Sequence, residues 1–263
     1  MHSIEVKNLV KIFGELRAVN DVSFFVEEGS IFAFLGPNGA GKTTTIKMLT
    51  TLLLPSSGSV RVNNIDPVKD SAGVRRSFGI VFQDPSLDDE LTAYENMEFH
   101  GVLYGIAKKI RRQRIEHLLT FVELWDRKND LTKYFSGGMK RRLELARGLL
   151  HHPKILFLDE PTLGLDPQTR NHIWEYIKNL NKEEGITVFF TTHYMEEADR
   201  VADTVAIIDK GAIIAQGLPH ELKLQTNTEN LEDAFLSLTG KEMREETVSG
   251  IERLRAHRRM WHR

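Results

Sequence analysis

One glycine-rich segment restricts the possible folds of this chain more than any other feature. The segment GPNGAGKT, from Gly36 to Thr43, fits the pattern G-x-x-x-x-G-K-[ST]. The apolar run SIFAFL precedes it, and residues 43–54 have the spacing of a helix. Because glycines let the backbone curl, its N–H groups can face phosphate oxygens. The segment therefore predicts a phosphate-binding loop between a buried strand and a helix.

The side chains of this loop indicate a nucleoside triphosphate with a divalent cation. Lys42 would reach the β- and γ-phosphates, and the Thr43 hydroxyl would ligate Mg²⁺. A glycine-rich turn without a ligand is the alternative, but the strand before the loop and the helix after it argue against that alternative. The residues predicted to bind phosphate are Gly36, Pro37, Asn38, Gly39, Ala40, Gly41, Lys42, Thr43 and Thr44.

A second apolar run, ILFLDE, ends in two carboxylates. Doubly wound sheets bind their ligands at the carboxyl ends of buried strands. Asp159 suits Mg²⁺, directly or through water, and Glu160 suits a general base that polarises the attacking water. The alternative is a pair of solvated acids at a strand end.

The order of the predicted elements indicates an α/β fold. Strands and helices alternate, which favours a mainly parallel sheet core covered on both faces, with a hairpin around residues 209–211. Residues 91–135 have a mostly helical pattern and predict an inserted helical lobe. Strand patterns occur at residues 4–13, 22–26, 30–35, 58–64, 78–83, 154–159 and 186–192, of which we expect the N-terminal ones to be antiparallel.

Composition excludes several classes of protein. The 263 residues include no cysteine, so disulfides and thiolate metal sites are excluded and the cytosol is favoured. The formal net charge of −2 gives no bulk attraction to nucleic acid, and we expect no nucleic-acid partner. No apolar run approaches the roughly 20 residues that span a bilayer, and the N-terminus has a strand pattern rather than a signal peptide. We expect any membrane part to come from another chain.

A second glycine-rich helix start lies about a hundred residues after the first. In KYFSGGMKRRLELARG, apolar residues recur with helical spacing from Met139 to Leu150, which places Ser136, Gly137 and Gly138 at a helix N-terminus. Free backbone N–H groups and the helix dipole make such an end a second anion site. The residues alone do not say why one chain needs two such sites.

Over about residues 3–217 the chain resembles the ATPase subunit of an ATP-binding cassette (ABC) transporter. Ser136 follows Lys42 by 94 residues, Asp159 follows Ser136 by 23, and His193 follows Asp159 by 34, as in that family. The stretch FSGGM resembles the family's signature motif. The resemblance implies that two ATPase subunits meet head to tail, so that the P-loop of one and the signature of the other close on the same ATP.

The resemblance also implies roles for further residues. Gln83 matches the glutamine that touches Mg²⁺ and reports to the helical lobe, and Asp166, also predicted to cap a helix with Pro167, matches a loop between subunits. His193 matches the switch histidine at the γ-phosphate, and Phe13 matches the aromatic that stacks on adenine. Ordinary structural positions remain the alternatives for Gln83, His193 and Phe13. The implied catalytic residues are Glu160, His193 and Lys42; the implied metal contacts are Thr43, Gln83 and Asp159; the implied nucleotide contacts, besides the loop, are Phe13, Gln83, Ser136, Gly137, Gly138 and Asp166.

Departures from the commoner signature resemble the drug-resistance-type exporters of the family. Met139 stands where Gln is common and Phe135 where Leu is usual, and NLEDAFLSLTG at 230–240 resembles the C-terminal segment of that subfamily. The resemblance implies a peripheral motor subunit at the cytoplasmic face of the cell membrane that uses ATP and Mg²⁺, pairs as a homo- or heterodimer and drives a separate permease. The alternative is a soluble ABC ATPase that uses the same cycle for assembly. A GTPase is disfavoured because the Asn-Lys-x-Asp signature is absent.

The sequence predicts a cassette core, a helical lobe and a C-terminal extension. The lobe and the extension each carry a prediction about a binding partner. By resemblance the lobe docks a permease, with Leu103, Tyr104 and Ile106 as candidate exposed apolar residues and core burial as their alternative. The tail at 251–263 carries five arginines and a tryptophan, which predict contact with an anionic membrane or, alternatively, a solvated or dimer-stabilising segment. The parts are the cassette core at 1–86 and 136–218, the helical lobe at 87–135 with the signature at its end, and the C-terminal extension at 219–263.

Overall fold

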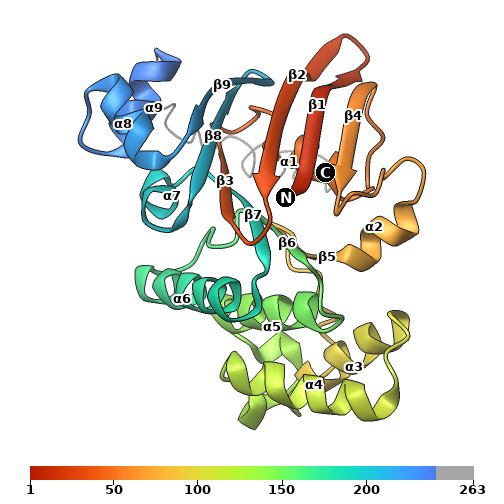
Figure 1. Ribbon diagram of the computed structural model, residues 1–263. Coiled ribbons are helices and arrows are strands. Elements are labelled where there is room, and N and C mark those ends of the chain that lie inside the picture. The colour runs from red at the N-terminus through yellow and green to blue at the C-terminus, as the bar shows by residue number, and fades with distance from the viewer. Residues whose placement is uncertain (241–263) are drawn as a thin grey trace, which may run out of the picture.

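A mainly parallel sheet lies at the centre of the fold. The computed structural model describes residues 1–240, and within them the strand order of this sheet is β5-β6-β7-β3-β8-β9 (Figure 1). Neighbouring strands are parallel except β8 and β9, which form the hairpin predicted around residues 209–211. The strands are β5 (Phe78–Val81), β6 (Ile155–Asp159), β7 (Thr187–Thr192), β3 (Ile31–Leu35), β8 (Thr204–Asp209) and β9 (Ala212–Gly217).

A second sheet is antiparallel and has the order β2-β1-β4. Its strands are β1 (His2–Phe13), β2 (Leu16–Glu27) and β4 (Ser57–Val62). The sequence pattern predicted the second of these strands only at residues 22–26, because the apolar and polar residues of LRAVND at 16–21 do not alternate regularly. They are nevertheless a strand, since the chain reverses at Gly14 and pairs Leu16 with Phe13.

Helices cover the central sheet and form a separate lobe. The helix after the glycine-rich loop ends at residue 49 rather than at the predicted 54, because Thr51 adopts a φ of +65°, outside the helical region. Among residues 1–240 the helices are α1 (Lys42–Leu49), α2 (Ser71–Ser77), α3 (Ala93–Leu103), α4 (Lys108–Phe121), α5 (Gly137–Leu149), α6 (Pro167–Glu184), α7 (Met195–Val201), α8 (Pro219–Thr226) and α9 (Leu231–Thr239), with 3₁₀ turns at Trp125–Arg127 and Thr132–Tyr134.

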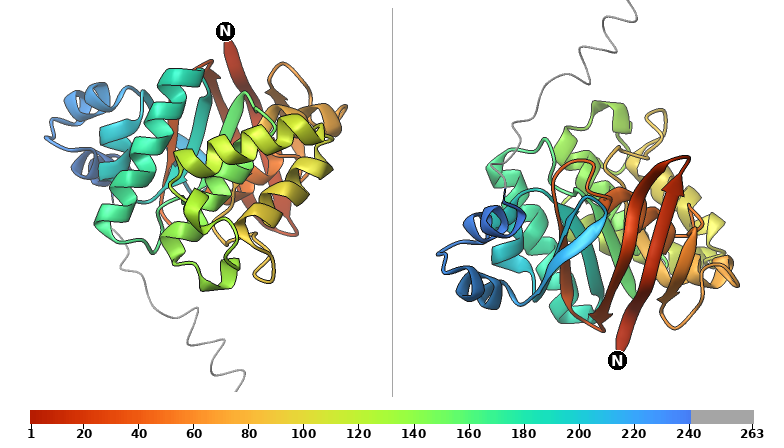
Figure 2. Two further views of the ribbon diagram at one scale, coloured as in Figure 1. Left: turned by 90° about the horizontal axis from the view of Figure 1, so that it is seen from below. Right: turned by 90° about the horizontal axis from the view of Figure 1, so that it is seen from above.

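The central sheet separates two apolar cores, because successive strand side chains point to opposite faces. From β3, Ile31, Ala33 and Leu35 join the core shared with the helices, whereas Phe32 and Phe34 join the core shared with α1 and the antiparallel sheet. Viewed from below, helices cover the central sheet, and viewed from above, the antiparallel sheet does (Figure 2). Burial on both faces explains why the strand sequences are apolar throughout.

The helical lobe gathers α3 and α4 beside α5, away from the antiparallel sheet (Figure 1). Thr92 and Glu95 form a capping box at the start of α3. Of the three apolar residues predicted to be exposed, Leu103 is 68% exposed, whereas Tyr104 and Ile106 are half-buried and Ile106 packs against the main core. The lobe surface therefore agrees with the prediction at Leu103 and only in part at the other two.

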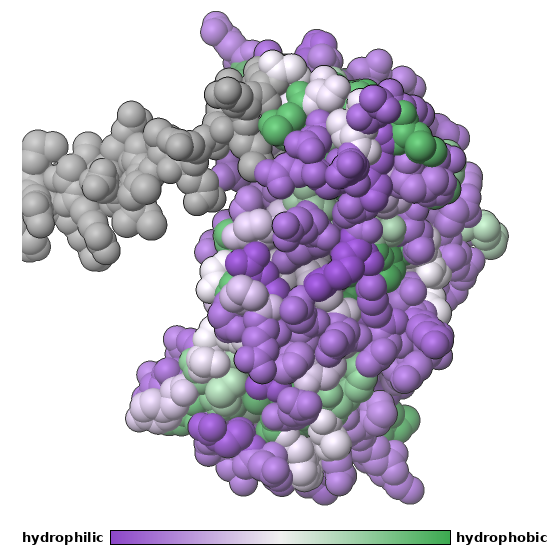
Figure 3. All heavy atoms as spheres, turned by 90° about the vertical axis from the view of Figure 1, so that its left-hand side faces the viewer, coloured by the Kyte–Doolittle hydropathy of each residue, from purple (hydrophilic) through white to green (hydrophobic). Residues whose placement is uncertain are grey.

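Helices α8 and α9 pack beside α7 and β9 through buried Leu222, Leu231 and Phe235. The molecular face seen in Figure 3 is mostly hydrophilic, with small scattered apolar areas. Scattered apolar residues are ordinary on a protein surface. The predicted basic tail at 251–263 lies outside the described residues. No helix within residues 1–240 is long and apolar enough to cross a bilayer.

Candidate active site

The glycine-rich loop joins the end of β3 to the start of α1. Gly36 has no room for a side chain, because a Cβ there would lie 2.3 Å from the carbonyl oxygen of Ile208. Gly41 adopts a φ of +109°, and its Cβ would lie 2.7 Å from the carbonyl oxygen of Ala18. Close backbone approach and positive φ therefore explain these two glycines of the motif.

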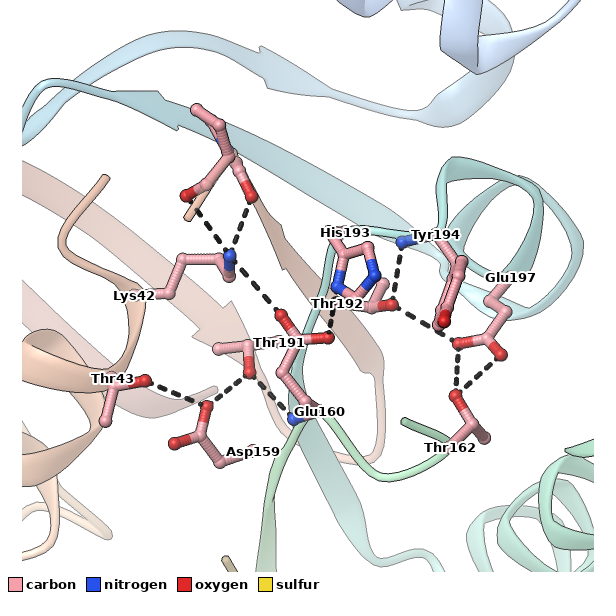
Figure 4. Close-up of polar contacts among 12 residues, drawn as sticks. Lys42, Thr43, Asp159, Glu160, Thr162, Thr191, Thr192, His193, Tyr194 and Glu197 are labelled. Atoms are coloured by element: carbon pink, nitrogen blue, oxygen red, sulfur yellow. Dashed lines mark hydrogen bonds and ion pairs between the residues drawn. The ribbon is translucent and has the colours of Figure 1, made fainter. Parts of the chain in front are cut away.

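Lys42 is the first residue of α1 and is only 6% exposed. Its Nζ donates to the carbonyl oxygens of Gly36 at 2.7 Å and Pro37 at 3.3 Å, and lies 3.3 Å from Oε1 of Glu160 (Figure 4). The ammonium group thus lies inside the loop, surrounded by oxygen acceptors. Phosphate oxygens could replace these acceptors without moving the charge far.

Glu160 follows β6 in a left-handed backbone conformation with a φ of +49°. Such a conformation is uncommon for a residue with a side chain, and it persists where neighbours hold it. Here the Glu160 N–H donates to Oγ1 of Thr191 at 3.0 Å and to its carbonyl oxygen at 3.2 Å. The neighbouring strand β7 thereby turns the Glu160 carboxylate toward the glycine-rich loop (Figure 4).

The Glu160 carboxylate lies between Lys42 and His193. Its Oε2 is 2.9 Å from Nδ1 of His193, on the side opposite the contact with Lys42. Burial raises the pKa of Glu160, but the hydrogen bond with His193 and the charge of Lys42 outweigh burial and hold the pKa below its ordinary value. A carboxylate that is ionised at neutral pH can accept a proton, as a general base must.

Thr43 and Asp159 offer two oxygen ligands beside the loop. Oγ1 of Thr43 lies 3.4 Å from Oδ1 of Asp159, which also accepts a 2.6 Å hydrogen bond from Thr191. Asp159 is 3% exposed, so this carboxylate is directed into the protein rather than into bulk water. A hydroxyl and a carboxylate are ligands that Mg²⁺ prefers, and the pair therefore fits that ion.

A pocket of about 400 Å³ joins most of the predicted site residues. The glycine-rich loop lines it together with Phe13, Gln83, Glu160 and His193. Its volume is in the range of small-molecule sites. Phe13 is 46% exposed, with Nζ of Lys11 at 5.0 Å from the ring centroid, so the alternative of Phe13 as a core residue is wrong. An exposed ring at the edge of this pocket can stack on a base.

The second glycine-rich helix start is separate from this pocket. As predicted, Ser136 is the N-cap of α5, and its Oγ accepts the N–H of the third helical residue at 3.3 Å. Ser136 and Gly137 are exposed. Gly138 faces Thr169, whose hydroxyl donates to the helix-capping Asp166 at 2.6 Å. The signature residues and Asp166 therefore lie next to each other but do not line the pocket.

Sequence reasoning missed two residues that support the site. Thr191 bonds both Asp159 and Glu160, and an apolar strand ending in Thr-Thr-His was a signal that could have indicated it. Glu197 is 6% exposed and accepts from Thr162 at 2.7 and 2.9 Å. Burial raises the pKa of Glu197 above its ordinary value despite that hydrogen bond. The acidic sequence MEEADR gave no sign that this carboxylate is buried.

The sequence also matches a known protein family. Residues 19–163 match the ABC transporter family. This chain belongs to the ABC transporter family. Linearmycin resistance ATP-binding protein LnrL of Bacillus subtilis (strain 168) is 40% identical over 241 residues, which cover 89% of this chain and 77% of the relative. Nod factor export ATP-binding protein I of Ralstonia nicotianae (strain ATCC BAA-1114 / GMI1000) is 42% identical over 219 residues, which cover 83% and 68%.

Solved structures of ABC ATPases have the same fold. An ATP-binding subunit of an ABC transporter is 30% identical, with a TM-score of 0.82 over 90% of this chain and 99% of that one. The dimeric ATP-binding cassette MJ0796, bound to ADP and Pi after hydrolysis, is 30% identical, with a TM-score of 0.73 over 82% and 98%.

These similarities confirm the predicted family, the fold class and the ATPase activity. The chain is an ATP-hydrolysing subunit of the exporter type of ABC transporter, rather than the soluble assembly ATPase considered as the alternative. The resemblance that rested on a signature ending in Met139 is confirmed at the level of this subfamily.

Proposed function

We propose that this chain binds ATP with Mg²⁺ in the pocket beside the glycine-rich loop and hydrolyses it there to drive export through a separate membrane permease. The observation that carries this proposal is the position of the Glu160 carboxylate, 3.3 Å from Lys42 and 2.9 Å from His193 beside a phosphate-binding loop. The triphosphate would lie along the loop, with its base against Phe13.

The proposal gives a role to each polar side chain beside the glycine-rich loop. Lys42 would bind the β- and γ-phosphate oxygens, and His193 would contact the γ-phosphate from the opposite side of Glu160. Glu160 would accept a proton from the attacking water as the bond to the γ-phosphate breaks. Thr43, Asp159 and Gln83 would hold Mg²⁺, which neutralises charge on the phosphates when bound.

We infer that one chain supplies only half of each hydrolysis site. Ser136 and Gly137 lie outside the pocket and are exposed at the start of α5, where backbone N–H groups favour an anion. A second cassette arranged head to tail would place its own signature over this chain's ATP. Asp166, at the start of the neighbouring α6, would lie at the contact between the two cassettes.

The lobe would dock the permease, which places the subunit peripherally at the cytoplasmic face of the cell membrane. Leu103 is 68% exposed, and Phe99 and Val102 on the same helix are 61% and 53% exposed. Neighbouring exposed apolar residues are typical of protein contact surfaces. Cargo contacts would lie in the permease, so the proposal names no cargo.

Two substitutions in the full-length protein test the proposed site. Glu160→Gln should lower kcat about 10²- to 10⁴-fold and keep ATP affinity, because it removes the base and preserves shape. Lys42→Ala should instead weaken ATP binding, because it removes the cation at the phosphates. Steady-state phosphate release and equilibrium binding of a fluorescent ATP analogue measure the two effects. Glu183→Gln, at an exposed position near the end of α6, is a control for the loss of a carboxylate. A wild-type kcat for Glu160→Gln would contradict the assignment of the base.

A further inference from the structure

We propose that Arg141, on the signature helix α5, is a positioning residue. It would fix the backbone positions of Gln83 and Glu160 relative to the signature of the same chain. The proposal rests on the proposed function, because it takes Glu160 to be the base. Arg141 lies in the third position after Gly138 and is 6% exposed, so its guanidinium is within the protein rather than on the surface.

The guanidinium of Arg141 donates to backbone carbonyl groups from two distant segments. Its Nη2 lies 3.0 Å from the carbonyl oxygen of Glu160 and 3.4 Å from that of Gln83, and its Nη1 bonds the carbonyl oxygen of Phe82. These carbonyls follow the ends of β5 and β6, where the chain leaves the sheet. A planar group with several fixed donors is suited to joining such acceptors in one geometry.

Glu144, one turn further along α5, fixes the orientation of Arg141. Its Oε2 lies 3.3 Å from Nη1 of Arg141, and its Oε1 accepts from the N–H and hydroxyl of Ser86 at 2.7 and 3.2 Å. Arg147, on the same helix, donates to the carbonyl oxygen of Ser86 at 2.8 Å. The segment at 82–86, which contains Gln83, is therefore fastened to α5 at both of its ends.

The cost of burying this pair indicates that it does more than fill space. A buried ion pair contributes little or nothing to stability relative to apolar residues of the same volume. Burial removes water from the Arg141 guanidinium and lowers its pKa, although the charge of Glu144 acts in the opposite direction. Because Ser136 lies five residues before Arg141, or about 7.5 Å along the helix, a shift of α5 on anion contact at Ser136 would reach the backbone of Glu160.

The double variant Arg141→Gln/Glu144→Gln tests this role by removing both charges of the buried pair together. The amide introduced at position 144 can still accept from Ser86, whereas the amide introduced at position 141 cannot donate to three carbonyls at once. We expect kcat to fall about 10- to 100-fold with KM for ATP within about twofold, because the base is misplaced while the phosphate loop is intact. Arg142→Gln is the matched control, because Arg142 contacts Val122 and Glu123 in the lobe, and it should keep wild-type kcat.

A second background separates positioning from general damage. In Glu160→Gln protein, adding the double variant should lower the single-turnover rate by less than about twofold, since the group being positioned is already lost. Arg141→Lys, which keeps the charge beside Glu144 but lacks the planar fork, should give an intermediate kcat with a native thermal transition.

Each outcome bears on one hypothesis. A wild-type kcat for the double variant, equal changes in kcat and KM, or a multiplicative loss in the Glu160→Gln background would overturn the role of Arg141. A wild-type kcat for Glu160→Gln alone would instead overturn the proposed base, whatever Arg141 variants do.

Discussion

The two glycine-rich helix starts of this chain use the same physics in opposite surroundings. The first opens α1, and its Lys42 is 6% exposed among carbonyl oxygens and the Glu160 carboxylate. The second opens α5, and its Ser136 and Gly137 are exposed and bordered by the start of α6. Both ends present backbone N–H groups to an anion. Only the first has side chains with a proposed catalytic role from its own chain beside it.

This difference supports the proposal that one fold carries two anion sites for one reaction. A helix N-terminus gives affinity for phosphate, but hydrolysis also needs a base and a cation within hydrogen-bond reach. The loop before α1 has Lys42 and Glu160 3.3 Å apart, whereas the signature residues do not line the pocket that contains these groups. The signature is therefore suited to completing a site on another chain.

Among the tests of this comparison, the largest effect is expected from blocking the second site alone. Ser136→Arg should lower kcat about 10²- to 10³-fold, because it removes an anion donor at the proposed dimer contact and adds bulk there. The affinity of the single chain for ATP should stay within about twofold, since Ser136 does not line the pocket. Phosphate release and nucleotide binding are measured on the same preparation. Weakened binding by the isolated chain would break the comparison.

Mixing Ser136→Arg protein with Lys42→Ala protein tests whether one site is shared between two chains. A heterodimer would contain one site built from an intact P-loop and an intact signature, so part of the activity should return. Crosslinking across the interface verifies that heterodimers form. No recovery despite heterodimers would count against a site shared between chains, or would show that both sites are needed.

A smaller effect is expected at His100, where α3 of the lobe packs against α5. Burial, with the charges of Arg147 and His151, lowers the pKa of His100 to about 4. His100 is therefore neutral in the fold but protonates below its ordinary 6.5 when unfolded. Its contribution to stability is complete above pH 6.5 and is lost as pH falls toward 4, by on the order of 2–3 kcal/mol.

Urea unfolding at pH 7.5 and pH 4.5 measures this loss. His100→Gln should reduce the difference between the two free energies of unfolding, whereas His117→Gln, at an exposed position of α4, should leave it unchanged. Some difference should remain, because burial also lowers the pKa of His151. If the difference between the free energies of unfolding at the two pH values is the same in His100→Gln protein as in wild type, the loss does not come from His100.

The next prediction compares two neighbouring glycines of the signature. A Cβ on Gly138 would lie 2.6 Å from Cγ2 of Thr169, whereas a Cβ on Gly137 would be 3.7 Å from Leu165. Thr169 is held by Asp166 and cannot turn away freely. Gly138→Ala should therefore cost about 1–2 kcal/mol in unfolding free energy, and Gly137→Ala should cost less than that. Equal losses of unfolding free energy for the two variants in urea would show that Thr169 moves aside.

The smallest expected change in stability is on the outer face of the lobe. Leu103→Glu should change the free energy of unfolding by no more than about 0.5 kcal/mol and keep basal ATPase activity, because Leu103 is 68% exposed. Transport by the assembled complex should fall if this face docks the permease. Met97→Glu, at a fully buried position of the same helix, is the contrasting variant and should unfold the lobe. Loss of stability in Leu103→Glu protein would place the docking face elsewhere.

Much of the fold was predictable from the sequence, because its signals are local. Apolar runs predicted β3, β6 and β7, and Asp166 with Pro167 predicted the start of α6. The first half of β2 was not predictable, since its residues show no regular alternation and become a strand only by pairing with β1. Helix α1 ends early at Leu49, because the backbone leaves the helical region at Thr51 despite a helical pattern.

The sequence by itself determined which chemical groups the site contains. The glycine pattern, the lysine and the paired carboxylates are fixed by short-range rules of backbone conformation and strand ends, and each lies within a few residues of the element that bears it. The tertiary structure decided which of those groups meet. Thr43 and Asp159 are 116 residues apart in the chain yet 3.4 Å apart in the fold, and the turn at Glu160 depends on Thr191 from another strand. Burial of Arg141 and exposure of Ser136 on one helix likewise follow from what packs against each, because burial depends on contacts that residue order does not specify.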